Sequence, residues 1–130
     1  MSVAVERFTA SLPADSRVLR DFRQQLSRWL EEAGVRDRSR HAILLAAHEA
    51  AANAIEHAAA PVTVVGRKEP DVILIEVTSV GRWGAHQQQS SDERGRGVAI
   101  MKSLLSDVEI RAEEERTTVC LRMNRAEGKS

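Results

Sequence analysis

The chain has 130 residues, of which 42% are hydrophobic and 29% charged, and its 19 basic and 19 acidic residues give a formal net charge of zero. This length fits one domain that can bury a core without disulfides, and a single cysteine cannot form an internal disulfide. The balanced charge and the scarcity of aromatic residues argue against direct nucleic-acid binding. Because no apolar run approaches 18 residues and no charged-then-apolar leader is found, we expect a cytoplasmic protein without a membrane span.

The first predicted elements are a strand over residues 3–11 and a helix that starts near residue 15 and ends near residue 33. The strand alternates and carries β-favouring residues, and Pro13 ends it. The helix has one apolar face, and Gly34 suits a left-handed stop. Its other face is either solvated or able to dock an acidic protein partner, because it carries Arg17, Arg20, Arg23 and Arg28.

A second helix is expected to start at residue 37 or 39 and to end before Pro61. Residues 41–58 contain no Gly or Pro and are dominated by Ala, Leu, Ile, Glu and His. Glu49, Asn53 and His57 recur every four residues, so their side chains form one polar stripe. Such a stripe is either a solvated helix face or a place where a carboxylate and a carboxamide share a ligand. Alanines between residues 46 and 52 make the helix slim, which would let a bulky ligand approach its backbone.

The rest of the chain predicts two pairs of strands with a loop and a helix between them. One pair spans residues 62–67 and 71–79, and the other pair is a hairpin of residues 108–112 and 117–123. The loop runs from residue 79 to residue 94, and a loop of this length is usually functional.

The third predicted helix, over residues 98–105, begins directly after Gly95-Arg96-Gly97. A glycine-rich start leaves backbone N–H groups and the positive end of the helix dipole open to a phosphate. The order of elements predicts an α/β, two-layer sandwich in which a mostly antiparallel sheet carries three helices on one face. We assign residues 1–124 to this domain and residues 125–130 to a polar tail.

Four segments together resemble the nucleotide-binding motifs of the anti-sigma factor serine-protein kinases. These kinases are a branch of the histidine-kinase-like ATPase superfamily, which also includes gyrase, the histidine kinases and a large heat-shock chaperone. The resemblance covers about residues 5–123 and implies a Bergerat-type ATPase fold. Its segments are Glu49-Ala-Ala-Ala-Asn53-Ala-Ile-Glu-His57-Ala58, Gly81-Arg-Trp83, Gly95-Arg-Gly97-Val-Ala-Ile-Met101 and Thr117-Thr118-Val119.

The resemblance implies that the chain binds ATP and Mg²⁺ and transfers a phosphoryl group to a serine. Asn53 would coordinate the Mg²⁺ that bridges the phosphates, and Glu49 would be the catalytic base toward the attacking hydroxyl. Residues 82–94 would form a lid over the nucleotide. The other nucleotide-binding positions would be Ser79, Gly81, Arg94, Gly95, Arg96, Gly97 and Thr117. The implied partners are a sigma factor, an antagonist protein and, as relatives commonly dimerise, a second copy of the chain.

Two positions depart from the family pattern. Ser79 stands where the family usually carries an aspartate that accepts a hydrogen bond from the adenine amino group, and Arg116 stands where a glycine commonly precedes the threonines. A hydroxyl accepts that bond without a charge, at a loss of about 1–3 kcal/mol. The alternative hypothesis is therefore a protein-binding regulator that retains the fold but binds ATP weakly or not at all.

Overall fold

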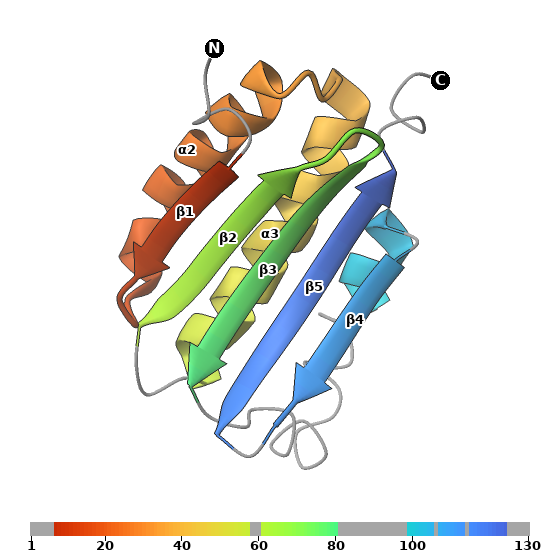
Figure 1. Cartoon of the computed structure of the whole chain (residues 1–130). Helices are drawn as coiled ribbons and strands as arrows, with labels where there is room; N and C mark the ends of the chain where they lie inside the picture. The colour runs from red at the N-terminus through yellow and green to blue at the C-terminus, as the bar shows by residue number, and fades with distance from the viewer. Residues whose placement is uncertain (1–6, 58–60, 81–98, 106, 114, 125–130) are drawn as a thin grey trace.

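The computed structural model describes residues 7–57, 61–80, 99–105, 107–113 and 115–124 (Figure 1). Residues 99–104 are helical. No described helix is long and apolar enough to cross a membrane. The other elements are β1 (Arg7–Leu12), the 3-10 helix η1 (Ser16–Val18), α2 (Leu19–Glu32), α3 (Asp37–His57), β2 (Val62–Lys68), β3 (Val72–Val80), β4 (Asp107–Ala112) and β5 (Arg116–Asn124).

The five strands form one sheet in the order β1-β2-β3-β5-β4, and every neighbouring pair is antiparallel. Helices α2 and α3 and the helical residues 99–104 cover the same face of the sheet (Figure 1). Strand β5 is therefore inserted between β3 and β4, and it begins beside the end of β3. This arrangement confirms the predicted two-layer α/β fold with three helices.

The core lies between the sheet and the helices, and the alternation of the strands decides which side chains enter it. In β3 every second side chain is buried, from Ile73 through Ile75 and Val77 to Ser79. The apolar stripe of α2 packs against the same layer, with Leu26 and other large side chains almost fully buried. Each such side chain stabilises the fold by about 1.5–3 kcal/mol.

The alanines of α3 allow close contact between the helix and the sheet. Ala46, Ala47, Ala50 and Ala51 are all 0% exposed and belong to the core. Because each side chain adds only one carbon, the helix can pack close to the strands without leaving voids. The slim face therefore accommodates the sheet, and the interpretation that it admits a bulky ligand is wrong for these four alanines.

The ends of α2 follow local signals in the sequence. The Asp15 carboxylate accepts a hydrogen bond from the backbone N–H of Arg17 at 3.0 Å, but this cap starts η1 and the regular α-helix begins only at Leu19. At the other end Gly34 has φ of 87°, which confirms the predicted left-handed stop. The backbone N–H of Val35 donates to the Leu30 carbonyl at 3.0 Å and completes a Schellman motif.

Gly66 marks a tight contact between β2 and α2. A Cβ atom at this position would lie 3.0 Å from the Trp29 ring and 3.2 Å from Cβ of Phe8, and Trp29 is only 5% exposed. We expect Gly66→Ala to lower the free energy of unfolding by about 1 kcal/mol, because overpacking outweighs the reduced entropy of the unfolded chain. Urea denaturation tests this, with Thr63→Ala on the exposed face of β2 as the control. An unchanged midpoint for Gly66→Ala would contradict the predicted clash.

Candidate functional site

Two hydroxyl side chains lie next to each other where β3 ends and β5 begins. Ser79 and Thr117 are direct partners in the β3–β5 register, and they are 1% and 0% exposed. Among the residues that the structure describes, they are the only buried polar side chains. The Ser79 Oγ atom has no hydrogen-bond partner there, and a buried hydroxyl left unpaired costs about 1–3 kcal/mol. The position is therefore suited to a polar group of a ligand.

Helix α3 brings the predicted acid and amide toward this end of the sheet. Glu49 and Asn53 lie one turn apart and are both half-buried, and α3 packs against β3 and β5. Figure 1 shows the carboxyl end of α3 behind the sheet, at the edge where β3 ends and β5 begins. The Nδ2 atom of Asn53 is buried and has no hydrogen-bond partner within the described part of the chain. This nitrogen is therefore not satisfied by the described fold.

The Arg116 side chain does not lie in the layer between the sheet and the helices, where Ser79 and Thr117 are buried. It is exposed and pairs with Glu113, with 3.6 Å between Nη2 and Oε1, whereas Thr117 beside it is buried. Successive side chains of a strand point to opposite faces, so Arg116 lies on the face without helices. Its departure from the family pattern therefore leaves the buried hydroxyl pair unobstructed.

Five predicted site residues lie outside the described residues, as does the predicted lid over residues 82–94. They are Gly81, Arg94, Gly95, Arg96 and Gly97. The helical segment that follows them is anchored, since Met101 is 0% exposed and Leu105 is 5% exposed. The phosphate-binding role of the glycine-rich segment stays a prediction, as does the polar tail over residues 125–130.

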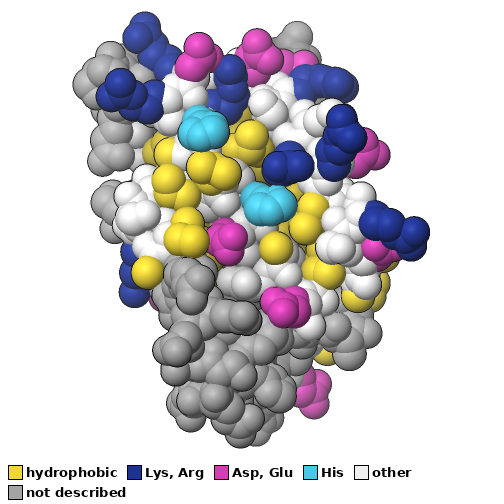
Figure 2. Space-filling view, turned by 180° about the vertical axis from the view of Figure 1, so that it is seen from behind, with side chains coloured by type: hydrophobic (Ala, Val, Ile, Leu, Met, Phe, Trp, Pro, Cys, Tyr) yellow, Lys and Arg dark blue, Asp and Glu magenta, His cyan; other side chains and the backbone are white. Residues whose placement is uncertain are grey.

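His48 is a further polar residue near the stripe. It lies on the helix-covered side of the molecule, where Figure 2 shows two histidines beside hydrophobic side chains. Its Nδ1 atom is buried without a hydrogen-bond partner in the described residues. Burial is the main cause that lowers the pKa of His48, and the positive charge of Arg23 lowers it further, against the opposing effect of Glu49. The sequence signal for this position was the spacing of three and four residues from His41 through Leu44 to His48, which places the three side chains on one helix face.

This lowered pKa predicts a pH-dependent stability. As pH falls through about 6.5, His48 of the unfolded chain takes up a proton before the folded protein does, so this residue makes stability fall toward acid pH. We expect His48→Gln to remove the contribution of this residue to the loss of stability between pH 7.5 and pH 5.5, as measured by urea denaturation. His41→Gln, on the exposed surface of the same helix, should leave it in place. An identical pH dependence in both variants would contradict the prediction.

Comparison with known proteins assigns the family. The sequence profile described as the histidine kinase-like ATPase domain matches residues 12–123, which is most of the chain. The chain belongs to the histidine kinase-like ATPase domain family. This confirms the resemblance at the level of the superfamily. The narrower assignment to the anti-sigma factor serine-protein kinases stays a prediction.

Comparison with solved structures adds a likeness in fold. The crystal structure of the RsbU and RsbW domains of Rv1364c from Mycobacterium tuberculosis matches with a TM-score of 0.72 and 24% sequence identity. The match covers 90% of this chain and 32% of that chain, so the present chain spans about a third of its length. At this identity the likeness shows the fold alone. No curated protein matches the sequence.

Proposed function

We propose that this chain is an anti-sigma factor serine-protein kinase. In this proposal it works in the cytoplasm as a homodimer, binds Mg-ATP, sequesters a sigma factor and phosphorylates an antagonist protein on serine. The observation that carries the proposal is the buried pair of Ser79 and Thr117. This pair lies at the end of the sheet toward which α3 runs, and α3 carries Glu49 and Asn53. Membership of an ATPase domain family supports it.

The donor set fits a nucleotide with its magnesium. Asn53 would offer its carboxamide oxygen, which is the kind of neutral oxygen ligand that Mg²⁺ accepts. Its Nδ2 atom, which has no partner among the described residues, would be left to donate to a group of the ligand. Ser79 and Thr117 would face the base. Bound Mg²⁺ would supply neutralisation of the phosphate charge.

Two more parts complete the proposed site. The phosphates would lie against the glycine-rich segment of residues 94–97 and Gly81, where backbone N–H groups and two arginines suit an anion. Glu49, which is half-buried, would accept the proton of the serine hydroxyl as that hydroxyl attacks. These side chains would position and polarise the reacting groups, and positioning is the main requirement of phosphoryl transfer.

Calorimetric titration of the purified chain with Mg-ATP tests the nucleotide site. We expect micromolar binding, and we expect Asn53→Ala to weaken it by about tenfold or more because a metal ligand is lost. Gln25→Ala is the matched control, since it removes an exposed carboxamide from α2. A folded protein that gives no heat with millimolar nucleotide would contradict the proposal.

The alternative is a protein-binding regulator that keeps the fold with weak or no ATP binding. The observation that favours it is the uncharged Ser79 at the position of the family aspartate. The same titration separates the two functions. Binding of a sigma factor without measurable nucleotide binding would favour the regulator, and transfer of phosphate to a serine would exclude it.

A further inference from the structure

An open groove runs along the outer surface of the helical layer, between α2 and α3. Its α2 wall repeats at the helical spacing of three and four residues, so its members share one face of the helix over about 16 Å. Leu44 lines the groove from α3. The residues of the α2 wall are Arg20, Arg23, Gln24, Ser27, Arg28 and Glu31.

Helix α3 contributes one apolar side chain to the groove and a second one beside it. Leu44 lines the groove and is half-buried, and the next residue, Leu45, is 39% exposed. His41 and His48 lie one turn before and after them on the same helix face. Figure 2 shows hydrophobic side chains gathered around two histidines, with Lys and Arg side chains near them.

The α2 wall is positively charged, and its charges are not satisfied within the described fold. Three arginines and one glutamate give a net charge of +2 (3 − 1). Arg20, Arg23 and Arg28 form no ion pair among the described residues, whereas Arg17 is paired with Asp15 at 2.9 Å. Free guanidinium groups are well suited to bind carboxylates in a bidentate manner.

We propose that this groove docks an acidic amphipathic helix of a partner protein. The apolar face of that helix would pack on Leu44 and Leu45, and its carboxylates would pair with Arg20 and Arg23. A basic wall that follows helical spacing, next to leucine side chains of the neighbouring helix, matches the helix-in-groove mode of recognition. A nucleic acid fits this surface less well, because Glu31 and Leu44 lie in it and the chain has no net charge. The docking surface does not depend on nucleotide binding.

Fluorescence anisotropy with a designed peptide tests the proposal. The probe is an 18-residue labelled helix with leucines on one face and glutamates on the other, and the comparison peptide carries glutamine in place of each glutamate. We expect the acidic peptide to bind at least about tenfold more tightly than the glutamine peptide at 150 mM NaCl. We expect the double variant Arg20→Glu/Arg23→Glu to lose about tenfold or more of this affinity.

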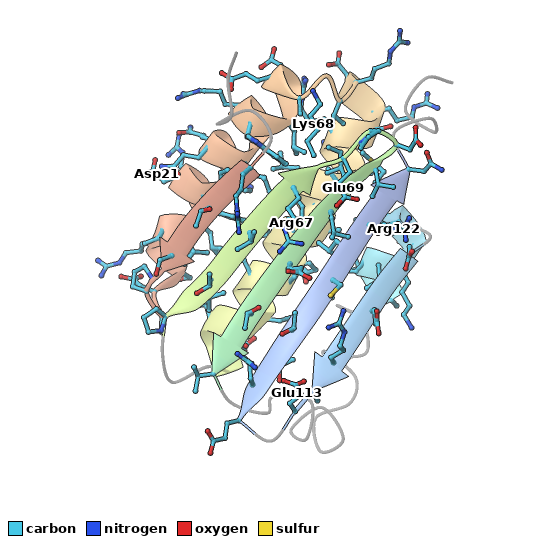
Figure 3. All side chains as sticks on the ribbon, viewed as in Figure 1. Asp21, Arg67, Lys68, Glu69, Glu113 and Arg122 are labelled. Atoms are coloured by element: carbon cyan, nitrogen blue, oxygen red, sulfur yellow. The ribbon has the colours of Figure 1, made fainter. Side chains whose placement is uncertain are left out.

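The matched control is Arg7→Glu/Arg67→Glu, which changes the net charge by the same amount. Arg7 and Arg67 are exposed cross-strand partners, and Figure 3 shows Arg67 on the sheet face away from the helices. This variant should keep peptide affinity within about twofold. Leu45→Gln, at an exposed position, should weaken binding without reversing a charge, which keeps the proposal testable if the double variant at α2 does not fold.

Three results would overturn the proposal. Equal losses in the two double variants would mean that only net charge attracts the peptide. Equal affinity of the glutamine peptide would remove the role of the arginines. Displacement of the acidic peptide by random-sequence duplex DNA, with DNA binding lost in Arg20→Glu/Arg23→Glu, would assign the surface to a nucleic acid instead.

Discussion

Glu49→Gln is expected to lower the rate of phosphoryl transfer to an antagonist serine by about 10²- to 10⁴-fold, while the affinity for Mg-ATP stays nearly constant. Glutamine keeps the size and shape of the side chain but cannot accept the proton of the attacking hydroxyl. The half-buried position of Glu49, one turn before Asn53, places it next to the proposed metal ligand without making it one. Appearance of phosphoserine on a candidate antagonist, followed with radiolabelled ATP under single-turnover conditions, measures the rate.

The control for this experiment is Glu32→Gln, which removes an equal charge at the exposed end of α2 and should leave the rate unchanged. A Glu49→Gln protein that transfers phosphate at the parent rate would place the base elsewhere. A variant that loses nucleotide affinity together with the rate would show that Glu49 acts in binding. The two outcomes are separated by calorimetry on the same protein.

Ser79→Asp is expected to strengthen ATP binding by about 10- to 100-fold, because a charge-assisted hydrogen bond contributes about 1.5–3 kcal/mol. Ser79 lies directly beside Thr117 on the helix side of the sheet, and its hydroxyl has no partner among the described residues. A carboxylate there would accept a hydrogen bond from the adenine amino group. Calorimetric titration of parent and variant with Mg-ATP gives the ratio of affinities.

Nucleotide selectivity sharpens this test. A hydroxyl can donate or accept, so at this contact the parent should distinguish ATP from GTP poorly, whereas a carboxylate only accepts and should favour ATP. Thr78→Asp is the matched control, since Thr78 is the neighbouring residue on the opposite face of β3. A Ser79→Asp variant with unchanged affinity for both nucleotides would show that this residue does not face the base.

Much of the local structure was predictable because it depends on neighbours in the chain. The left-handed stop at Gly34, the apolar stripe of α2 and the strand pairs on either side of the long loop follow from backbone freedom and from alternation. The start of α2 was less predictable. The helix was expected to start near residue 15, but Asp15 caps the 3-10 helix η1 there and the regular α-helix starts at Leu19.

Cys120 shows a limit of alternation as a guide. It is 7% exposed. It lies on the sheet face without helices, where Arg111 Nη2 donates to its Sγ at 3.3 Å and Glu76 Oε2 is 3.9 Å away. Because its neighbour Leu121 is buried as well, the pattern of β5 alone does not tell which face receives the helices.

Periodicity and residue type were enough to predict the helix that carries Glu49 and Asn53, since a spacing of four residues puts side chains on one helix face whatever surrounds it. The contact between Ser79 and Thr117 was a different matter. Those residues lie far apart in the chain and meet only because β5 is inserted next to β3, and strand order depends on the packing of the whole sheet. The role of the α3 alanines was likewise decided by tertiary packing, because only the position of the sheet determines which face of a helix is buried.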